Sequence, residues 1–397
     1  MNSLKYNIQE ISSLFKGIKP KRLDLFFKLS FSILSSKTVC LYKTVDEAIK
    51  VIPSKNIESC YQKLVNFFCT GLSDLYLDSI FKVIIYLFGG KKGKKEEDKI
   101  YLSIDRTTWQ IGQRRINLLV IGVVHKNICI PLVWKDLGRK GNSNTKQRLE
   151  LLDRLLTGWK ELSFEVPLLE ISGDREFIGD EWLVGLEHRG LDFVLRLKEN
   201  QQFHVWHKKK LSAKKVNLKS LAKRLQGKQK AWTEIVTESG YIVKLIIIPN
   251  TGRNAKKEPF LFLVTNVPEA DIQQIQEKFG FRWSIECCFK HLKSNGFHLK
   301  EISLEHEHKI HLMLAILTFL YALCIHEGLE KGTKKMKKYA NGQSYRVKSV
   351  FRSGLSILKE QISSVEELVN LLKRVIIEKW KSNLFLEHKN HIKFIYI

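Results

Sequence analysis

The amino-acid sequence predicts an α/β protein: a mixed β-sheet flanked by helices, with a helical domain before it and a β-rich insertion inside it. Three features carry this prediction. Residues 1–90 show helical patterns without strand alternation. Residues 100–198 follow the order strand, strand, strand, helix, strand, helix, strand, and residues 199–265 add further strand-like runs before a long helical segment.

The first 90 residues contain apolar runs with helical spacing at 22–34 and 78–88, and Pro53 and Gly71 interrupt the region. This pattern indicates a small helical domain with basic residues on its outer faces. The lysine-rich segment 91–98 is then expected to be a linker to the next part of the chain.

Residues 100–198 predict the sheet itself. Three β-type runs, IYLSIDRTTW, RRINLLVIGVVH and ICIPLVWKDL, are joined by short connections, which favours an antiparallel meander. A helix over 145–159, a strand over 166–174, a helix over 180–188 and a strand over 191–198 follow. This order gives a mixed sheet with helices on its faces.

The remaining elements are an insertion and a helical end. The insertion, residues 199–265, has a lysine-dense first half and a strand-rich second half. A long helix over about 269–293, a buried helix over 309–327, a basic loop and a helical tail come next. The apolar run Leu312–Ile325 is about 14 residues long, which is too short to span a bilayer and indicates a buried helix.

The charge of the chain indicates its partner. Lysine and arginine total 67 against 41 aspartates and glutamates, and the resulting net charge of +26 is spread along the chain. A polyanionic partner follows, and nucleic acid fits better than a membrane; a general lysine-rich composition is the alternative. Basic clusters at 91–95, 208–215 and 334–338 would add non-specific phosphate affinity.

Cysteine usage and the N-terminal residues indicate the compartment. The 7 cysteines are an odd number without a C-x-x-C pair, which favours reduced core thiols over a zinc site. The sequence MNSLKYNIQE lacks the apolar core of a signal peptide. We therefore expect a cytoplasmic protein without a membrane partner.

One helical segment combines residues that suggest phosphate and metal chemistry. Phe279, Arg282, Glu286 and Lys293 are spaced so that a continuous helix places them within roughly a 60° arc. The other face carries Trp283, Ile285 and Cys288. A carboxylate between two cations in a very basic protein suggests a metal ligand among phosphate-binding residues. The alternative is an ordinary surface salt bridge at i, i+4 spacing.

Two further carboxylates follow predicted strands. Asp105 ends the first strand and Asp174 comes just after the fourth, so both are expected at the rim of the sheet. Strands one and four can lie side by side, and the helix bearing Glu286 would bring a third carboxylate there. Like charges so close require compensation, which two Mg²⁺ ions (or Mn²⁺ as a substitute) about 4 Å apart would supply. Turn capping by the two aspartates is the alternative.

With these residues, the chain resembles the DDE transposases of bacterial insertion sequences, in the group with a Tyr-x2-Arg-x3-Glu-x6-Lys signature. The signature reads Phe279-x2-Arg282-x3-Glu286-x6-Lys293 here, with Phe in place of Tyr. The first and second aspartate motifs match Asp105-Arg106-Thr107 and Gly173-Asp174-Arg175-Glu176, and Arg196 with Lys198 matches a basic pair. The resemblance covers residues 100–330, including the strand-rich insertion.

The resemblance implies an RNase H-like core in which Asp105, Asp174 and Glu286 bind two Mg²⁺ ions. Arg282, Lys293 and Phe279, together with Arg175, Arg196 and Lys198, would contact DNA or its phosphates. The expected reaction is nicking at the terminal inverted repeats, hairpin formation and opening, and strand transfer into target DNA. A homodimer would hold two double-stranded DNA ends in a synaptic complex, in the bacterial cytoplasm at the nucleoid.

The resemblance also sets the expected domain boundaries. A helical DNA-binding domain would span 1–95, the two parts of the catalytic core 96–198 and 266–330, and the insertion 199–265. Residues 331–397 would form a helical region for DNA contact or dimerisation.

Two departures and two rival functions accompany this prediction. Phe279 lacks the tyrosine hydroxyl that would contact a phosphate. The tryptophan that stacks on a flipped base in relatives aligns with Leu261, so Trp232, Phe260 and Phe262 are the stacking candidates, with a core role as the alternative. The rival functions are an inactive or domesticated DNA-binding relative and an RNase H-like structure-specific nuclease. The presence of all three carboxylates favours the transposase.

Overall fold

The computed structural model describes residues 11–88, 99–162, 168–207, 210–224, 231–250, 255–267, 271–338 and 344–384. Two compact units make up the chain: Met1–Lys91 with His291–Ile397, and Lys92–Lys290. The predicted linker at 91–98 lies outside the described residues.

The second unit is built on the predicted mixed sheet. Its first five strands are β1 (Ile100–Ile111), β2 (Arg114–His125), β3 (Ile128–Asp136), β4 (Leu169–Gly173) and β5 (Leu191–Arg196). Strands β1 to β3 form the antiparallel meander, while β4 is parallel to both β1 and β5. The spatial order β3-β2-β1-β4-β5 confirms the predicted RNase H-like α/β fold.

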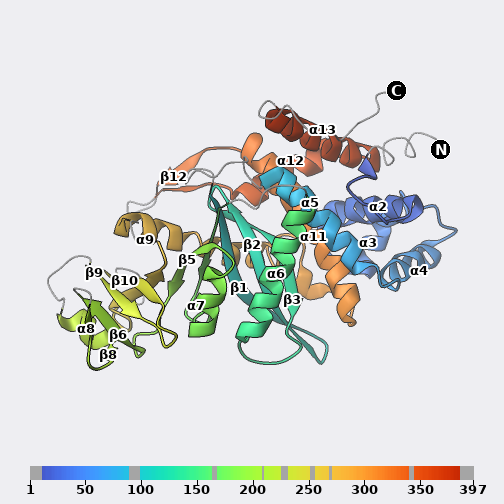
Figure 1. The fold of residues 1–397 in the computed structure, drawn as a ribbon. Coiled ribbons are helices and arrows are strands. Elements are labelled where there is room, and N and C mark those ends of the chain that lie inside the picture. Colours follow the sequence, from blue (N-terminus) through green and yellow to red (C-terminus); the bar gives the residue numbers. More distant parts are fainter. Residues whose placement is uncertain are drawn as a thin grey trace. The chain divides into compact units, whose positions relative to one another are not determined.

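Two helices cover this part of the sheet. Helix α6 (Thr145–Glu161) begins with a reciprocal capping box between Asn144 and Gln147, and it buries leucines and Trp159. It contacts β2 and β3, while α7 (Asp180–Glu187) contacts β5 and α6, as Figure 1 shows. These apolar contacts keep the loops after β3 and β4 on a rigid base.

The insertion extends the same sheet. Its elements are β6 (Gln202–His207), β7 (Lys210–Leu211), β8 (Val216–Asn217), α8 (Leu218–Arg224), β9 (Ala231–Val236), β10 (Ile242–Pro249) and β11 (Phe260–Thr265). Strand β11 pairs antiparallel with β5, so the described residues form an 11-stranded sheet that ends in β10-β9-β6-β7. The prediction of a β-rich insertion is confirmed, and its strands continue the core sheet. Val194, Ile246 and Leu263, all fully buried, join the two parts.

The predicted single helix over 269–293 is wrong. The chain forms α9 (Ile272–Gly280) and α10 (Trp283–Lys293). Between them the hydrogen bonds tighten to i→i−3: the Phe281 amide donates to Lys278 O at 3.1 Å and the Arg282 amide to Phe279 O at 3.1 Å. Gly280, a poor helix former, ends α9 at this point.

The first unit is largely helical, and its N-terminal part forms the helices that were predicted before residue 90. It contains α2 (Pro20–Ser36), α3 (Leu41–Ala48), α4 (Ile57–Phe68), α5 (Ser73–Phe88), α11 (Glu307–Glu330), α12 (Val350–Gln361) and α13 (Val365–Leu384), a 3₁₀ turn at Leu299–Glu301, and a hairpin of β12 (Met336–Lys338) and β13 (Ser344–Arg346). Its core includes an aromatic cluster of Phe26, Tyr76 and Phe319, in which the Phe26 ring lies 5.1 Å from Tyr76 and 5.5 Å from Phe319.

Helix α11 confirms the predicted buried helix. By length and apolar composition it could cross a membrane, and so could α2 and α3 taken as one bent pair. However, 94% of the most apolar window of α11 is buried, as in the core helix of a globular protein. The cysteines are all free thiols, and Cys60, Cys129, Cys288 and Cys324 are buried.

Candidate active site

The two aspartates lie on neighbouring parallel strands. Ile104 of β1 pairs with Gly173, the last residue of β4, so the next residues are Asp105, still within β1, and Asp174, directly after β4. A Cβ on Gly173 would come within 3.0 Å of the Ile104 side chain, which explains the glycine where the strands approach closely. The prediction that Asp105 ends its strand is wrong, because β1 continues to Ile111 along β2.

Asp105 is largely buried. Its Oδ1 accepts a hydrogen bond of 2.7 Å from the Arg106 amide, and its Oδ2 lies 3.8 Å from Nη1 of Arg282. Burial raises the pKa of Asp105 to about 6, against the opposing effects of the Arg106 amide and Arg282. The charges of Glu286 and Glu176 add to the increase.

The guanidinium of Arg282 lies close to the carboxylates of both Glu286 and Asp105. Nη1 of Arg282 lies 2.6 Å from Glu286 Oε1, and the carbonyl of Arg282 accepts a 3.5 Å hydrogen bond from Ser103 of β1. The Arg282 guanidinium carbon is 5.7 Å from the centre of the Phe279 ring. The ordinary i, i+4 salt bridge is therefore present, but the same arginine also connects α10 to Asp105.

Asp174 has a different environment. Its Oδ1 is inaccessible to solvent and has no hydrogen-bond partner among the described residues. The closest charge to it is Nη1 of Arg196, at 3.6 Å. A buried carboxylate oxygen in this state is costly unless a cation compensates it.

The three carboxylates fit a divalent metal site by their chemistry. Within the described part of the chain, no three His, Cys, Asp or Glu side chains are gathered tightly enough to hold an ion. Arginines stand among the carboxylates instead, with Arg282 between Asp105 and Glu286 and Arg196 beside Asp174. The Asp174 oxygen that accepts no hydrogen bond among the described residues and the raised pKa of Asp105 both mark oxygen ligands that a hard cation would stabilise.

Sequence comparison decides the family. The family model described as transposase DDE domain matches residues 96–323, more than half of the chain. This chain belongs to that family. No curated protein matches it. Among solved structures, a piggyBac transposase in a synaptic complex with hairpin DNA aligns over 96% of this chain and 78% of its own, with 10% identity and a TM-score of 0.47.

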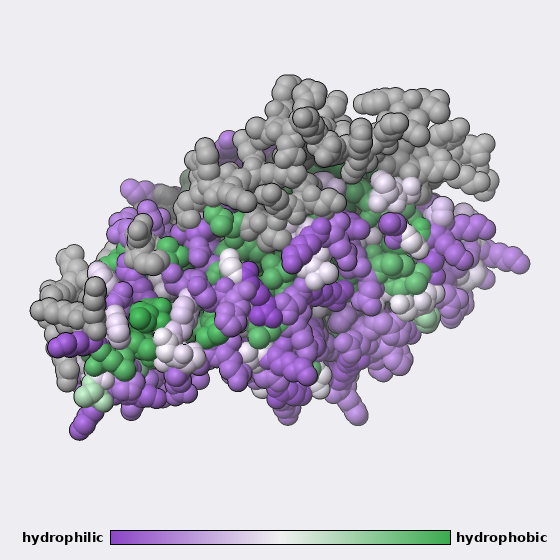
Figure 2. Space-filling view, viewed as in Figure 1, coloured by the Kyte–Doolittle hydropathy of each residue, from purple (hydrophilic) through white to green (hydrophobic). Residues whose placement is uncertain are grey.

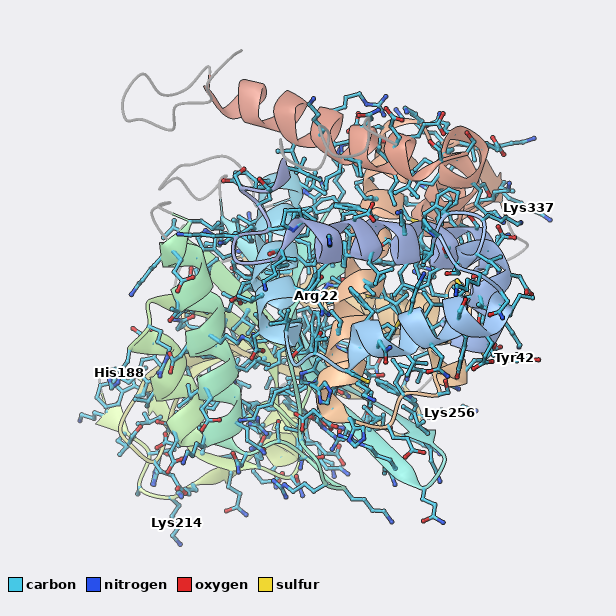
Figure 3. All side chains as sticks on the ribbon, turned by 90° about the vertical axis from the view of Figure 1, so that its right-hand side faces the viewer. Arg22, Tyr42, His188, Lys214, Lys256 and Lys337 are labelled. Carbon is cyan, nitrogen blue, oxygen red and sulfur yellow. The ribbon has the colours of Figure 1, made fainter. Side chains whose placement is uncertain are left out.

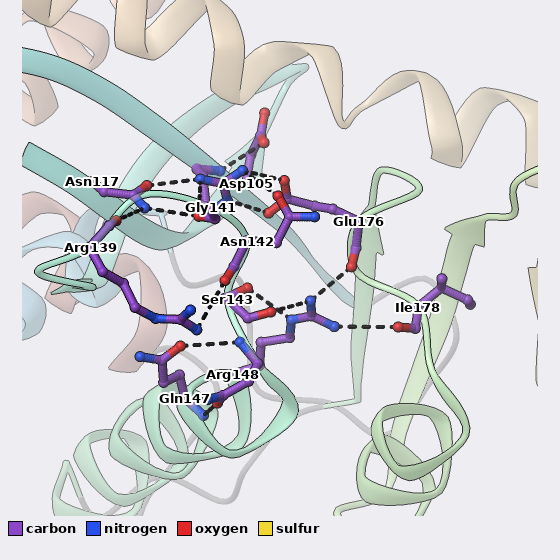
Figure 4. A network of polar contacts seen from close by, with 12 residues as sticks. Asp105, Asn117, Arg139, Gly141, Asn142, Ser143, Gln147, Arg148, Glu176 and Ile178 are labelled. Atoms are coloured by element: carbon purple, nitrogen blue, oxygen red, sulfur yellow. Dashed lines mark hydrogen bonds and ion pairs between the residues drawn. The ribbon is translucent and has the colours of Figure 1, made fainter.

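A polar network in the transposase joins the two strands that carry the aspartates (Figure 4). Arg106, the residue after Asp105, donates to both oxygens of Glu176, two residues after Asp174, at 2.6 and 2.8 Å. The same guanidinium donates to Asn117 Oδ1, Gly141 O and Asn142 Oδ1, each at 2.9 Å. This bidentate pair links the residue that follows Asp105 to the second residue after Asp174.

A second arginine extends the network. Arg148 of α6 is buried, with 4% of its surface exposed, and donates to Glu176 O at 2.8 Å and Ser143 O at 2.6 Å (Figure 4). Sequence analysis placed Arg106 and Glu176 only as motif letters and did not identify Arg148. The contact between Arg106 and Glu176 could have been found in part from the sequence, because both residues follow shortly after the predicted neighbours Asp105 and Asp174.

A buried ion cluster lies before α10, which carries Glu286. Glu170 of β4 is 2% exposed, and its Oε2 lies 2.9 Å from Nζ of Lys278 on α9 and 3.6 Å from Nζ of Lys99. Lys278 also lies 5.7 Å from the centre of the Tyr101 ring. This cluster fastens α9 to β4, four residues before Arg282.

The aromatic candidates differ in exposure. Trp232 is 57% exposed, with the Lys244 ammonium 4.9 Å from its ring, whereas Phe260 is half-buried and Phe262 is 2% exposed. Trp283 was expected on an apolar face with Ile285 and Cys288, but it is 64% exposed. At about 100° per residue, Trp283 lies roughly 160° from Ile285 and only about 60° from Glu286 around a helix, so it shares the side of Glu286. Ile285 and Cys288 do face the core.

The basic candidates also occupy distinct places. Arg175 and Arg196 both pair with Glu258 beside Asp174. Lys198 is exposed just beyond β5, and Lys293 is half-buried at the end of α10, two turns after Glu286.

Asp105→Asn is expected to stabilise the metal-free transposase at about pH 7.5 by roughly 1–3 kcal/mol. Folding raises the pKa of Asp105 from 3.8 to about 6, so its contribution is fully favourable below 3.8 and is lost as pH rises through about 6. Above that, the folded protein carries the full cost of a buried charge, which asparagine removes. Urea unfolding at several pH values measures the effect.

The stabilisation should shrink as pH falls toward 4, because wild-type Asp105 is then protonated in the folded state. Asp153→Asn removes an exposed carboxylate that pairs with Arg189 and should give no such gain. Equal stability of wild type and Asp105→Asn at about pH 7.5 would contradict the assignment of Asp105 as a strained site residue.

Proposed function

We propose that this transposase cuts DNA at the ends of an insertion sequence and joins them to target DNA at a site formed by Asp105, Asp174 and Glu286. One observation carries the proposal: Arg282 contacts both Asp105 and Glu286, and the strand that bears Asp105 pairs with β4, which ends just before Asp174. Family membership makes DNA transposition the general activity. The specific site, metal and steps are proposals.

The carboxylates would hold two Mg²⁺ ions, or Mn²⁺ as a substitute, which when bound would activate a water or a 3′-hydroxyl and stabilise the leaving oxygen. Asp105 and Asp174 would be held at fixed spacing by the Arg106–Glu176 pair. Glu286 would be positioned by α10, and Arg282 and Lys293 would hold phosphates near the cleaved bond. Phe279 would offer its ring without a phosphate-binding hydroxyl.

The steps would follow one chemistry. Water would first displace the 3′-oxygen at the end of the element. The freed 3′-hydroxyl would then attack a phosphodiester of the opposite strand, displace the 3′-oxygen of the flanking DNA and close a hairpin. Water would reopen the hairpin and restore the 3′-hydroxyl for strand transfer. Trp232 and Phe260 of the insertion, and the exposed Trp283, would be candidates to stack on a displaced base.

DNA would bind through the basic surface. Hydrophilic residues cover most of the coloured face in Figure 2. Lys214 and Lys256 project from the insertion and Lys337 from the β12–β13 hairpin in Figure 3, and all three are exposed. We propose that residues 1–95 bind the terminal inverted repeats, that 331–397 contact DNA or a second copy, and that a homodimer holds two ends. Such binding should weaken steeply with salt.

A cleavage assay tests the function. DNA carrying the terminal inverted repeats of the element that encodes the chain is incubated with protein and Mg²⁺ or Mn²⁺. We expect nicks at the repeat ends, then strand-transfer products when target DNA is present. Equal nicking of every duplex would favour a general nuclease, and specific binding without cleavage would favour an inactive, domesticated relative.

A further inference from the structure

An acidic side chain of the insertion forms ion pairs with two arginines near Asp174. Glu258 lies between β10 and β11, and its Oε1 is 2.5 Å from Nη1 of Arg175 while its Oε2 is 2.6 Å from Nη2 of Arg196. Arg175 directly follows Asp174, and Arg196 is the last residue of β5. Each carboxylate oxygen therefore takes one guanidinium, and Arg196 also faces Asp174 at 3.6 Å.

The backbone of Glu258 is held separately from its carboxylate. Asn250 Nδ2 donates to Glu258 O at 2.8 Å, and the Asn250 amide donates to Pro259 O at 2.9 Å, so both bonds are made at the base of the β10–β11 connection. The carboxylate can thus leave the arginines by side-chain rotation while the loop base remains in place. Its 27% exposure and the 50% exposure of Arg175 leave the group accessible from solvent.

The arginine pair has the chemistry of an oxyanion site. Two guanidiniums that each bind one oxygen of a carboxylate can bind two oxygens of a phosphodiester in the same manner. Partial burial raises the pKa of Glu258, but the hydrogen bonds and charges of Arg196 and Arg175 outweigh it and hold the pKa below its ordinary value. The carboxylate therefore carries the single negative charge that a DNA phosphate also carries.

We propose that Arg175 and Arg196 form a phosphodiester-binding site beside Asp174, and that Glu258 occupies this site as an internal anion until a DNA phosphate replaces it. The identity of the ligand rests on the proposed function. Because the DNA phosphate replaces a carboxylate of equal charge, the exchange by itself adds little binding free energy. The site would then fill only when other contacts already hold the DNA, which disfavours random duplexes.

Metal-free binding of a fluorescent duplex of arbitrary sequence tests the exchange. Glu258→Gln should tighten binding about two- to tenfold relative to wild type, the range expected when a partly exposed charge pair no longer competes. Glu238→Gln makes the same change in net charge in the same insertion, where Glu238 pairs with Lys215 at 3.2 Å. It should change affinity much less.

A double-mutant cycle separates local competition from net charge. In an Arg175→Gln background, the gain from Glu258→Gln should fall to that of the Glu238→Gln control. Equal gains from Glu258→Gln and Glu238→Gln in the wild-type background would overturn the proposal. Weaker binding by Glu258→Gln would also overturn the proposal, because it would show that Glu258 orients the two arginines for DNA binding.

The outcome is independent of catalysis, because binding is measured without metal. If Glu258→Gln binds more tightly but the wild type never cleaves end-bearing DNA, the internal-anion inference holds and the proposed function fails. If the wild type cleaves end-bearing DNA and the double-mutant cycle shows no coupling, the proposed function holds and the internal-anion inference fails.

Discussion

Asp174→Asn is expected to abolish cleavage of end-bearing DNA while leaving the protein folded. Asparagine keeps the shape of the side chain but removes the charge that would hold a divalent ion. A metal ion contributes several kcal/mol to transition-state stabilisation, and about 1.4 kcal/mol corresponds to a tenfold change in rate, so the loss should be about a thousandfold or more. Single-turnover cleavage in Mg²⁺ and in Mn²⁺ measures it.

The matched control is Asp153→Asn on α6. Asp153 pairs with Arg189 at 2.6 Å and has 52% of its side chain exposed, so the substitution makes the same charge change at the surface. It should leave cleavage within a few-fold of wild type. Asp174→Asn should also bind duplex DNA at least as well as wild type, because it removes a negative charge. Cleavage by Asp174→Asn at the wild-type rate would exclude Asp174 as a metal ligand.

The sheet was predictable because its information is local. Runs of Ile, Leu and Val separated by short connections give the β1–β3 meander, and the helical crossover to β4 places that strand beside β1. The positions of Asp105 and Asp174 follow from this topology. The extension of the sheet by the insertion did not follow, since it depends on the pairing of β11 with β5 across more than 60 residues of chain.

The segment from α9 to α10 shows where local patterns fail. Spacing alone predicted a continuous stripe from Phe279 to Lys293, and only Gly280 signalled the break. Arg282 still reaches both Phe279 and Glu286 across it. The exposure of Trp283 agrees with the helical period, because at about 100° per residue Trp283 lies roughly 60° from Glu286 and about 160° from the buried Ile285.

Side-chain partners far apart in sequence were the least predictable part of the site. Glu258 and Arg175 are 83 residues apart, and Arg106 and Glu176 are 70 apart. Charge pairing between such residues depends on loop paths that composition does not encode. These pairs nevertheless lie next to the two aspartates, because Arg106 follows Asp105 and Arg175 follows Asp174.

Arg106→Met is expected to destabilise the transposase by about 3–5 kcal/mol, the cost of removing one partner from a largely buried ion pair. The Arg106 and Glu176 side chains are 16% and 19% exposed. Without the guanidinium, Glu176 keeps its charge, and Asn117 and Gly141 lose a donor. Urea unfolding of the metal-free protein measures the change.

A second variant separates unpaired charge from lost packing. Glu176→Met alone should also destabilise, whereas the double substitution Arg106→Met with Glu176→Met should recover part of the loss, because it leaves no uncompensated charge. Arg139→Met in the same loop region removes an exposed arginine that donates to Asn142 O at 3.3 Å, and should change stability by less than about 0.5 kcal/mol.

The double variant also tests whether the pair serves the site. It should regain stability without regaining cleavage, because two methionines cannot fix the spacing of the segments that carry Asp105 and Asp174. Its affinity for Mn²⁺, measured by calorimetry, should be weaker than that of wild type. Wild-type Mn²⁺ affinity in a stable double variant would show that the Arg106–Glu176 pair supports the fold alone, and that the aspartates are positioned by the strand pairing of Ile104 with Gly173.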